Sequence, residues 1–541
     1  MTRLCVPIFV RSVEQARRDS LMAVEHGADM VELRIDALLS GDGALEKPYS
    51  EAEISALAGL VRDLHDQNTP TIVTCRPADE GGLSEANHDA RFTALASIVY
   101  ESPAWVDLEW RALTQTGAWP MVFLDLAASE HGQNGSGSGT RFVASAHDFQ
   151  GRPDNLVRLF NEMSESRADA VKMVWRARSI RDNIEAFELL REAAKPSVAL
   201  CLGEDGLISR VLAKKFGAYL SFASLSDDMA TADGQVPIRT LIDVYRWRQI
   251  GRSTKVYGVI GDPVGHSRSP HVHNAAFTAT DHDGVYLPLH VNAGYESFKA
   301  FLETALGFGP LEMYGLSITL PHKENALQWA KERGAEISET AEKIGAVNTL
   351  SFDPGDDSGE VKIVADNTDF SAILDTITDA LGCDRAALAE KSVAVLGAGG
   401  TGRCAVAALT SVGANVTVFN RSTQRGKDLA GDFGIESFPL EQAAEHKADI
   451  WINTTSVGLS PNVDQSPMPM SPPSWNEQTL VFDTIYNPAE TRLMRQARQA
   501  GCRVVGGEPM FIHQAAAQSR IWTGLTPPVD AMREAFGKIR L

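Results

Sequence analysis

The chain has 541 residues, of which 44% are hydrophobic, and this length predicts roughly three or four domains that can each form a core. The formal net charge of −20, with no basic face evident, argues against a nucleic-acid partner and leaves small molecules as the expected ligands. No apolar run approaches the ~18 residues of a membrane span, and the N-terminus lacks a signal-peptide pattern. The six cysteines form no C-x-x-C pair, so we expect reduced thiols, no metal site and a cytoplasmic protein, for which a monomer is one allowed state.

The first 250 residues alternate short β-rich apolar runs with amphipathic stretches, which predicts parallel strands joined by crossover helices. This is the size of a (β/α)8 barrel, and we expect a TIM barrel over residues 1–250, with an open doubly wound sheet as the alternative. Nine candidate strands compete for the eight places in such a barrel. The doubtful strand is Met121–Leu126, because the Gly/Ser-rich segment Gly132–Thr140 follows it instead of a helix.

Lys172 lies in the run DAVKMVW, inside a predicted strand with apolar neighbours. A buried amine is costly unless it is paired or uncharged, and an uncharged amine attacks carbonyl groups, so we expect Schiff-base chemistry. The alternative is a lysine on the helix-covered face that reaches solvent. His147, in SAHDF at the end of the preceding strand, favours the first interpretation, because barrel active sites lie at strand ends and need an acid/base there. A structural histidine is the alternative for His147.

Other charged and polar side chains follow the predicted barrel strands, at the ends where barrel active sites lie. Each one alone indicates no more than a solvated loop, but together they indicate a site for a small polyhydroxy acid. The set comprises Glu32, Arg34, Arg76, Glu80, Asp107, Glu109, Arg210 and Gln235.

The runs VELRID, TCRPADEGG, SAHDF, AVKM and GLISR…GQ resemble, in this order, the motifs of type I 3-dehydroquinate dehydratase over about residues 4–237. The resemblance implies that Lys172 forms an imine with the substrate ketone, that His147 transfers the protons and that Glu80 orients His147. It further implies that the substrate carboxylate is held by Arg210 and Gln235, and the ring hydroxyls and carbonyl region by Glu32, Arg34 and Arg76.

The loop that ends at Gln235 departs from the pattern of this family. It reads Thr231-Ala232-Asp233-Gly234-Gln235, where the family usually has Ser-Ala-Pro-Gly-Gln. Thr231 keeps the hydroxyl, and we count it with the substrate-binding residues. Asp233 in place of proline predicts a looser loop, because proline restricts the backbone.

A short polar segment, Trp247–Lys255, ends the barrel pattern and marks the best domain boundary. We expect an α/β lobe over residues 255–365 and a second α/β lobe over residues 366–506. In the first lobe, Ser267 and Ser269 lie on a loop that opens a helix, where hydroxyls and free backbone N–H groups suit a carboxylate. Helix capping by Ser269 is the alternative.

Two charged residues of opposite sign lie near the ends of elements in the same region. Lys323 follows a strand in SITLPHKE, and Asp369 lies in ADNTDF. If the fold brings them together, they can share a proton with a substrate oxygen during hydride transfer. A surface salt bridge is the competing interpretation.

A glycine-rich turn in KSVAVLGAGGTGR indicates a dinucleotide-binding lobe. Gly397, Gly399 and Gly402 have G-x-G-x-x-G spacing, which lets the backbone approach a pyrophosphate at a helix N-terminus. The strand Val393–Leu396 and a small-residue helix flank the turn, as this motif requires.

The residues after the next strand indicate which dinucleotide binds. That strand ends at Asn420, 18 residues after Gly402, where an NAD-binding lobe has an acid. Arg421 and Ser422 follow instead, and a planar cation with a hydroxyl predicts the 2′-phosphate of NADP. The alternative for Arg421 is an arginine on an exposed turn.

These motifs, with GAVNTL, NTTSVG, DTIYNPAETRL and GGEPMFIHQA, closely resemble shikimate dehydrogenase over about residues 256–541. The resemblance implies a substrate-binding lobe, completed by C-terminal helices within residues 507–541, and a Rossmann NADP-binding lobe. It also implies that Lys323 and Asp369 handle the proton. It implies substrate contacts from Ser267, Ser269, Thr319, Asn348, Asp369, Tyr486 and Gln514. It implies cofactor contacts from Gly397, Ala398, Gly399, Gly400, Thr401, Gly402, Asn420, Arg421, Ser422, Thr454 and Met510.

The two resemblances together predict a bifunctional enzyme of the shikimate pathway. Its N-terminal half would dehydrate 3-dehydroquinate, and its C-terminal half would reduce the product with NADPH, without a metal. One alternative pairs the dehydratase with a quinate dehydrogenase, although retention of Ser267 and Ser269 favours shikimate. Another is a catalytically inactive metabolite sensor, which the intact candidate catalytic residues disfavour.

Overall fold

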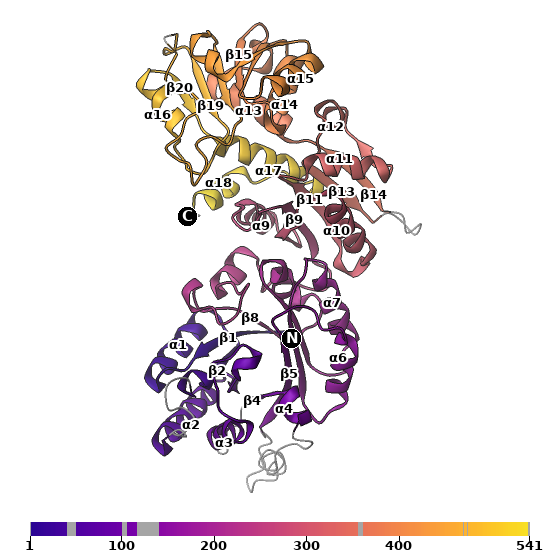
Figure 1. Ribbon diagram of the computed structural model, residues 1–541, viewed down its shortest axis with the longest axis vertical. Coiled ribbons are helices and arrows are strands. Elements are labelled where there is room, and N and C mark those ends of the chain that lie inside the picture. Colours follow the sequence, from indigo (N-terminus) through magenta and orange to yellow (C-terminus); the bar gives the residue numbers. More distant parts are fainter. Residues whose placement is uncertain are drawn as a thin grey trace.

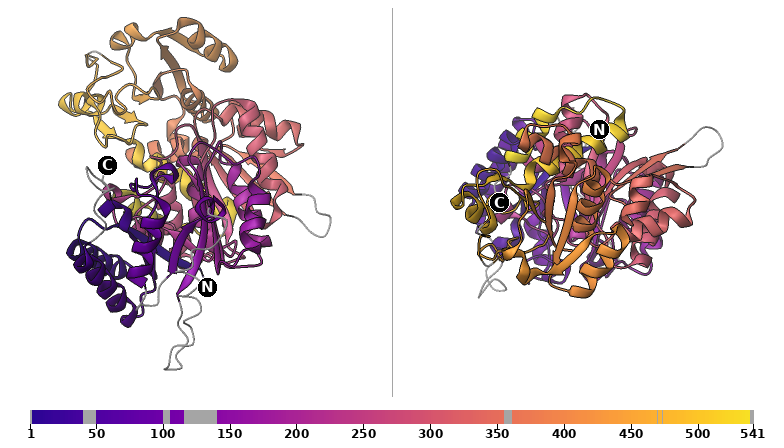
Figure 2. Two further views of the ribbon diagram at one scale, coloured as in Figure 1. Left: turned by 60° about the horizontal axis from the view of Figure 1, so that its bottom comes forward. Right: turned by 90° about the horizontal axis from the view of Figure 1, so that it is seen from above.

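The structure is a computed structural model, and it describes residues 2–39, 50–99, 105–115, 140–354, 361–468, 470–472 and 474–538. Its three sheets follow one another along the long axis, from an N-terminal barrel through a mixed sheet to a parallel sheet (Figure 1). The view from above in Figure 2 places the orange and yellow parallel sheet in front of the indigo barrel. No helix within the described ranges combines the length and the apolar character that a bilayer span needs.

Eight parallel strands form the barrel in the order β7-β6-β5-β4-β3-β2-β1-β8. They are β1 (Arg3–Phe9), β2 (Met30–Arg34), β3 (Thr71–Thr74), β4 (Trp105–Glu109), β5 (Arg141–Asp148), β6 (Ala170–Arg176), β7 (Ser197–Leu202) and β8 (Leu220–Phe222). The sheet closes between β7 and β8, where the Tyr219 amide donates a 2.8 Å hydrogen bond to the Ser197 carbonyl oxygen. This closure confirms the predicted barrel, and the open doubly wound sheet is wrong. Met121–Leu126 lies outside the described residues.

The first two barrel helices begin at serine caps, Ser12 before α1 and Ser50 before α2. Before α2, the Ser50 side chain accepts a hydrogen bond from the Glu53 amide, and the Glu53 carboxylate accepts one from the Ser50 amide. The helices are α1 (Val13–Glu25), α2 (Glu51–Asp66), α3 (His88–Val99), α4 (Trp110–Gln115), α6 (Leu156–Glu165), α7 (Asp182–Glu192) and α8 (Leu207–Val211). Short helical turns are η1 (Ile35–Leu39), η2 (Ala78–Glu80), η4 (Glu204–Gly206), η5 (Leu212–Lys214), η6 (Asp227–Met229) and η7 (Thr240–Val244).

The middle sheet is mixed and has the order β10-β9-β11-β13-β14-β12. Its strands are β9 (Lys255–Gly261), β10 (Gly284–His290), β11 (Met313–Ile318), β12 (Glu336–Ile337), β13 (Thr349–Asp353) and β14 (Lys362–Asp366). Strand β13 runs antiparallel to β11 and β14, whereas β9, β10 and β11 are parallel. Its helices are α9 (Ser269–Ala279), α10 (Tyr295–Gly307), α11 (Lys323–Glu332) and α12 (Glu339–Ile344), with the turn η8 (Gly309–Leu311).

The third sheet is parallel and has the order β17-β16-β15-β18-β19-β20. Its strands are β15 (Ser392–Leu396), β16 (Asn415–Asn420), β17 (Glu436–Pro439), β18 (Ile450–Asn453), β19 (Leu480–Asp483) and β20 (Arg503–Val505). Its helices are α13 (Asp369–Leu381), α14 (Gly400–Ser411), α15 (Thr423–Phe433) and α16 (Arg492–Gln499), with the turns η9 (Arg385–Leu388) and η10 (Leu440–Glu445). The strand order reverses between β15 and β18, and dinucleotides bind at such a switch point.

Two C-terminal helices return to the middle sheet, as Figure 1 shows in yellow. Helix α17 (Gly507–Thr523) contacts β11, β13 and α13, and α18 (Val529–Gly537) packs against α9. The Trp522 indole donates a 3.0 Å hydrogen bond to the Leu350 carbonyl oxygen and so ties α17 to β13. The end of the chain therefore completes the core around the middle sheet.

The barrel contacts the middle sheet through charged side chains, of which Lys215 is buried and the others are partly buried. Lys215 Nζ lies 2.6 Å from Glu312 Oε2, and the lysine side chain is almost fully buried. His290, at the end of β10, lies with Nδ1 2.7 Å from Asp205 of the barrel and with Nε2 3.4 Å from Asp262. These contacts connect the turn after β7 with the loop after β9, and both loops lead to pockets.

Candidate active sites

A pocket with about 490 Å³ of space, part of it open to solvent, lies at the carboxyl ends of the barrel strands. Parallel barrel strands end at one rim, so side chains far apart in the sequence meet there. Of the side chains predicted for the first site, nine line this pocket, and Asp107 and Glu109 lie behind it. The nine are Glu32, Arg34, Arg76, Glu80, His147, Lys172, Arg210, Thr231 and Gln235.

Lys172 projects from β6 into the barrel interior and is 7% exposed. Its Nζ lies 3.0 Å from Asp107 Oδ2, 3.5 Å from Glu32 Oε1 and 4.6 Å from the centre of the Phe222 ring. The lysine therefore lies inside the barrel and not on its helix-covered face. Its amine faces the pocket with two carboxylates within reach of its protons.

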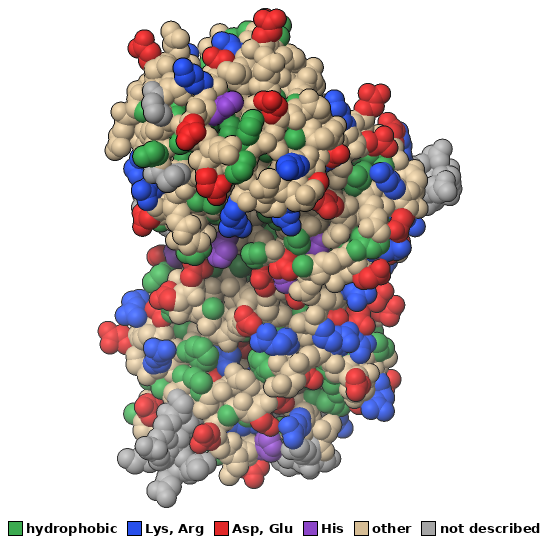
Figure 3. Space-filling model, turned by 45° about the horizontal axis from the view of Figure 1, so that its top comes forward, with side chains coloured by type: hydrophobic (Ala, Val, Ile, Leu, Met, Phe, Trp, Pro, Cys, Tyr) green, Lys and Arg blue, Asp and Glu red, His purple; other side chains and the backbone are tan. Residues whose placement is uncertain are grey.

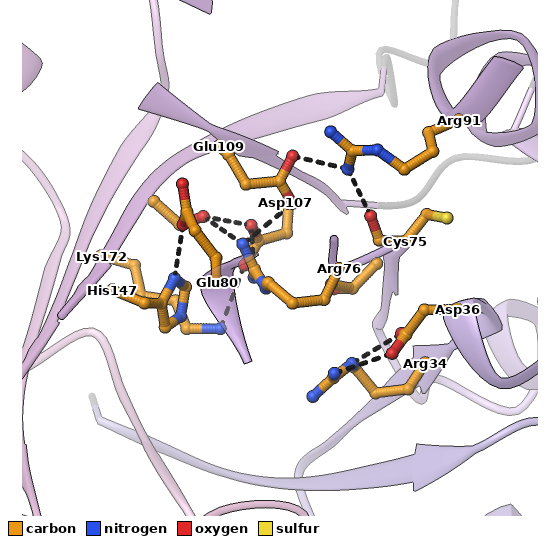
Figure 4. A network of polar contacts seen from close by, with 12 residues as sticks. Arg34, Asp36, Cys75, Arg76, Glu80, Arg91, Asp107, Glu109, His147 and Lys172 are labelled. Carbon is orange, nitrogen blue, oxygen red and sulfur yellow. Dashed lines mark hydrogen bonds and ion pairs between the residues drawn. The ribbon is translucent and has the colours of Figure 1, made fainter. Parts of the chain in front are cut away.

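His147 ends β5, and Figure 4 shows it beside Lys172 and Glu80. Its Nδ1 lies 3.2 Å from Glu80 Oε2. Burial, together with the cations Arg76 and Lys172, lowers the pKa of His147 well below its ordinary value, so the imidazole is neutral near pH 7. Burial raises the pKa of Glu80 to about 7. A neutral imidazole next to a carboxyl that titrates near pH 7 is suited to accept a proton.

Arg76 is 2% exposed and contacts a group of polar side chains (Figure 4). Its guanidinium nitrogens lie 2.7 Å from Asp107 Oδ1, 3.0 Å from Glu109 Oε1 and 2.8 Å from Ser145 Oγ. Although burial opposes ionisation, Arg76 and Lys172 hold the pKa of Asp107 well below its ordinary value. Asp107 thus joins Arg76 to Lys172, a role that the motifs did not predict. Two-residue spacing on a strand puts Asp107 and Glu109 on one face, and that spacing was the available signal.

Two further arginines line the pocket in different environments. Arg34 donates two 2.9 Å hydrogen bonds to the carboxylate of Asp36. Arg210 is 2% exposed and has no carboxylate within ion-pair distance in the described part of the chain, and its buried Nε has no hydrogen-bond partner there. Burial lowers the pKa of Arg210 to about 10. Because a buried cation without an acid is costly, a bound substrate anion would offset part of this cost.

The segment of residues 231–235, which we call the lid loop, forms one wall of the pocket. Gln235 Oε1 accepts hydrogen bonds from the Thr231 amide at 2.9 Å and from the Thr231 hydroxyl at 3.3 Å. The Arg210 Nη2 donates a 3.3 Å hydrogen bond to the carbonyl oxygen of Asp233. The lid loop therefore contacts the arginine that lacks an acidic partner.

A second pocket, with about 2110 Å³ of open space, lies between the middle sheet and the parallel sheet. Figure 3 shows the surface hollowed below the upper lobe. Residues from both lobes line it, including those predicted to hold substrate and some predicted to hold cofactor: Ser267, Ser269, Thr319, Lys323, Asn348, Asp369, Thr401, Tyr486, Met510 and Gln514.

Lys323 and Asp369 meet in this pocket, at the starts of α11 and α13. Lys323 Nζ lies 2.6 Å from Asp369 Oδ2, and their side chains are 20% and 10% exposed. Burial works against the charge of the lysine, but Asp369 outweighs it and raises the pKa of Lys323. Asn348 Oδ1 accepts a 2.8 Å hydrogen bond from the Thr368 amide and so holds the residue before Asp369. The pair is a pocket feature and not an exposed surface salt bridge.

The serine-bearing loop before α9 places Ser267 and Ser269 at the wall of this pocket. Ser267 Oγ accepts a 3.2 Å hydrogen bond from the Ser269 amide, and Ser269 makes no side-chain cap. Behind the loop, Ser317 Oγ donates to Gln518 Oε1 at 2.8 Å, and Gln518 Nε2 donates to Thr349 Oγ1 at 3.0 Å. Gln518 lines the pocket and was not predicted, although it lies one helical turn after the predicted Gln514 on α17.

The glycine turn between β15 and α14 fits a pyrophosphate. Gly397 has φ +109°, and a Cβ at Gly402 would lie 2.3 Å from the Gly397 carbonyl oxygen. By contrast, Cβ atoms at Gly399 and Gly400 would meet nothing within 4 Å, so the helix N-terminus is open to a ligand. The Thr454 hydroxyl donates a 2.8 Å hydrogen bond to the Leu396 carbonyl oxygen beside the turn.

The end of β16 lies next to this turn. Asn420 Oδ1 accepts a 3.1 Å hydrogen bond from the Ala398 amide, which aligns the strand end with the glycines. Arg421 and Ser422 are exposed, and Ser422 Oγ accepts from the Arg425 amide at 3.5 Å as the cap of α15. An exposed guanidinium at this position is free to contact a phosphate.

Family models match nearly the whole chain. The type I 3-dehydroquinase model matches residues 4–252. The shikimate dehydrogenase substrate binding domain matches residues 259–350, and the shikimate/quinate 5-dehydrogenase model matches residues 381–491. The shikimate 5′-dehydrogenase C-terminal domain matches residues 507–535, which include α17.

Individual relatives resemble either both halves or the second half. The chloroplastic bifunctional 3-dehydroquinate dehydratase/shikimate dehydrogenase of Arabidopsis thaliana is 33% identical over 99% of this chain and 84% of that protein. The NADP(+) shikimate dehydrogenase of Methanothermobacter thermautotrophicus is 36% identical over 53% of this chain and 97% of its own. The crystal structure of shikimate 5-dehydrogenase from Thermus thermophilus, in complex with NADP(H) and shikimate, is 34% identical over 52% of this chain and 99% of that chain, with a TM-score of 0.45.

A closed barrel with an inward lysine, followed by two lobes around a lysine–aspartate pair, defines a two-site enzyme of small-molecule metabolism. The likeness to the Arabidopsis protein extends over both sites. The chain belongs to the family of bifunctional 3-dehydroquinate dehydratase/shikimate dehydrogenases.

Proposed function

We propose that each pocket catalyses one of two consecutive reactions of the shikimate pathway. The chain converts 3-dehydroquinate to 3-dehydroshikimate in the barrel pocket and reduces that product to shikimate in the pocket between the lobes. The observation that carries the assignment is the buried Lys172, which faces a neutral His147 inside the barrel.

In the barrel pocket, the Lys172 amine adds to the substrate ketone and expels water to form an imine. The imine acidifies the neighbouring C–H, and His147 removes that proton and then protonates the departing hydroxyl. Glu80 holds the Nδ1 side of His147, which leaves Nε2 free for the transfer. Hydrolysis of the imine releases the product and restores the amine of Lys172.

The substrate carboxylate has a matching cation in the barrel pocket. We assign it to Arg210, because this buried guanidinium lacks an acidic partner in the described part of the chain, and to Thr231 and Gln235 of the lid loop. Glu32 and Arg34 are assigned to the ring hydroxyls. Arg76, predicted for the same role, lines the pocket and also forms ion pairs with Asp107 and Glu109. We therefore assign it a structural role in addition to substrate binding.

In the second pocket, Ser267 and Ser269 bind the carboxylate, and Thr319, Asn348, Tyr486 and Gln514 surround the ring. NADPH supplies the hydride when it is bound. The charged Lys323 donates a proton to the carbonyl oxygen as the alcohol forms, and Asp369 holds the ammonium in place.

The cofactor is NADP(H), held by this chain's own turn and strand end. The turn of residues 397–402 binds the pyrophosphate through backbone N–H groups, and Arg421 pairs with the 2′-phosphate. Asn420 and Ser422 shape the strand end, Thr454 lies beside the turn, and Met510 lines the pocket between the lobes.

One assay tests the proposal. Purified protein is mixed with 3-dehydroquinate without and then with NADPH, and again with borohydride. We expect enone absorbance to rise without NADPH, NADPH to be consumed when it is present, and borohydride to leave a covalent adduct on Lys172. The variants Lys172→Met and Lys323→Met should each abolish one activity and leave the other. Absence of both enone and adduct would contradict the dehydratase assignment. Reduction of 3-dehydroquinate without reduction of 3-dehydroshikimate would contradict the shikimate assignment.

We also propose the cellular setting and the domain limits. Six free cysteines, five of them buried, fit a reducing cytoplasm, and Figure 3 shows Lys and Arg interspersed with Asp and Glu on the face in view. The domains are residues 1–250, residues 255–365 with 507–541, and residues 366–506, in a monomer without nucleic-acid or membrane partners. Cell fractionation, light scattering and limited proteolysis test these three points.

A further inference from the structure

The lid loop packs directly on the turn that follows β7. Gly234 has φ +75°, and a Cβ at this position would lie 2.4 Å from the Gly203 carbonyl oxygen. The Gly203 amide donates a 3.4 Å hydrogen bond to the Asp233 carbonyl oxygen, to which Arg210 also donates. Any residue at position 233 can make these backbone contacts. They place the loop but do not explain why its tip is an aspartate.

The Asp233 side chain forms an ion pair across the pocket rim. Its Oδ2 lies 3.1 Å from Nη2 of Arg176, at the end of β6, the strand that carries Lys172. Both groups lie over the turn after β7, since a Cβ at Gly203 would be 3.7 Å from Arg176 Nη1 and 3.9 Å from Asp233 Oδ2. The ion pair therefore crosses the pocket rim from the lid loop to the catalytic strand.

Arg176 also reaches the segment after the catalytic histidine. Its Nε donates a 3.1 Å hydrogen bond to the Phe149 carbonyl oxygen. The Phe149 ring lines the pocket and stacks on His147, with ring centres 6.3 Å apart and planes 12° apart. A single guanidinium thus joins the lid loop to the turn that packs against His147.

We propose that Arg176 and Asp233 form a latch that holds the lid loop closed over the Lys172 pocket, with Arg176 as a positioning residue for the dehydratase reaction. The proposal rests on the dehydratase function proposed above. In the latch, an ion pair restricts the conformation of the lid loop, as a proline would do by restricting the backbone. Asp233 in place of proline therefore leaves the loop fastened and not looser.

The latch is expected to act on substrate affinity and not on the chemical step. Neither residue touches the reacting atoms, but the closed loop places Thr231 and Gln235 in the pocket wall and contacts Arg210. Substrate affinity falls in proportion to the fraction of molecules in the binding-competent state. The two side chains are 44% and 56% exposed, so the pair is partly screened by solvent, and we expect about a fivefold effect on KM.

A double-mutant cycle tests the latch with the full chain. Arg176→Gln and Asp233→Asn should each raise the KM for 3-dehydroquinate about fivefold and change kcat less than twofold. The double variant should be no worse than either single variant, because one shared contact is lost. Arg17→Gln removes an ion pair of similar exposure, between Arg17 and Asp63 at 2.6 Å on α1 and α2, away from the lid loop, and should leave KM unchanged.

Further readouts separate the possible failures. Unchanged KM in both single variants, or effects that multiply to about 25-fold in the double variant, would overturn the latch. Circular dichroism and thermal melting of each variant report on folding of the barrel. If Arg176→Gln fails to fold, Asp233→Asn carries the test: added salt must raise the KM of the parent more than that of this variant. Lack of enone formation by the parent chain would instead refute the proposed function.

Discussion

Replacing Glu80 by glutamine perturbs the proton chemistry of the barrel pocket at a defined point. Glu80 Oε2 lies 3.2 Å from Nδ1 of His147, and burial raises the pKa of Glu80 to about 7. The pKa of His147 lies well below its ordinary value because of burial and the nearby cations. Of these two groups, only Glu80 changes charge between pH 6 and pH 8. The ionised carboxylate supports the imidazolium that forms during catalysis, and glutamine cannot.

The structure sets an upper limit for this effect. A carboxylate and an imidazolium at 3.2 Å attract each other by about 5 kcal/mol at an effective dielectric constant of ~20. The burial of both groups and the dipole of the replacing amide reduce this value, so we expect kcat/KM to fall about 100-fold. In the parent, kcat/KM should rise with pH through about 7 as Glu80 ionises, whereas Glu80→Gln should show no rise in this range.

Stability provides the control against simple misfolding. The pKa of Glu80 is about 7 in the folded state and 4.5 ordinarily, so the folded state binds the proton more tightly than the unfolded state. Ionisation of Glu80 therefore lowers the free energy of unfolding increasingly between pH 4.5 and 7. Glu80→Gln should therefore be more stable than the parent above pH 7, by up to ~3 kcal/mol. Enone absorbance and thermal melting at pH 6 and 8 are the measurements. An inflection near pH 7 that survives in Glu80→Gln would refute the reasoning.

Three further outcomes test other parts of the chain. Arg421→Ala should raise the KM for NADPH about tenfold and leave NADH kinetics unchanged, because only NADPH carries the 2′-phosphate. Gly402→Ala places a Cβ 2.3 Å from a carbonyl oxygen and should lower the melting temperature and NADPH affinity, whereas Gly431→Ala, with nothing within 4 Å, should do neither. Burial opposes the charge of His290, but Asp205 and Asp262 raise its pKa above the ordinary value. The ion pairs of His290 therefore stabilise the folded chain fully below pH 6.5, and this stabilisation is lost as pH rises through the raised pKa. His290→Gln should therefore lower the melting temperature at pH 6 and have little effect at pH 8.5.

The motifs predicted many of the pocket residues because their chemistry is local. Lys172 in an apolar strand and the glycines at G-x-G-x-x-G spacing can each be recognised from the few residues that surround them. Strand alternation then decides which side chains face inward. The barrel and the parallel sheet followed from the same alternation of strands and helices.

Partners that are distant in the sequence could not be predicted in this way. Asp107 was recognised as a strand-end charge, but its contact with Lys172 depends on the curvature that brings β4 and β6 to one interior. The expectation that Asp233 loosens its loop considered the backbone alone and missed Arg176 on another strand. Gln518 lines the second pocket because α17 packs against the middle sheet.

The sequence by itself determined the kinds of element and the two chemistries, and it predicted many of the residues that line the two pockets. It could do so because strand periodicity, turn glycines and charged residues within apolar runs are properties of short segments. The tertiary structure alone decided which carboxylates contact Lys172 and that Arg176 pairs with Asp233 of the lid loop. It also decided that burial raises the pKa of Glu80 and lowers that of His147. Ion pairs and burial depend on distances between segments, and only the packed chain sets those distances.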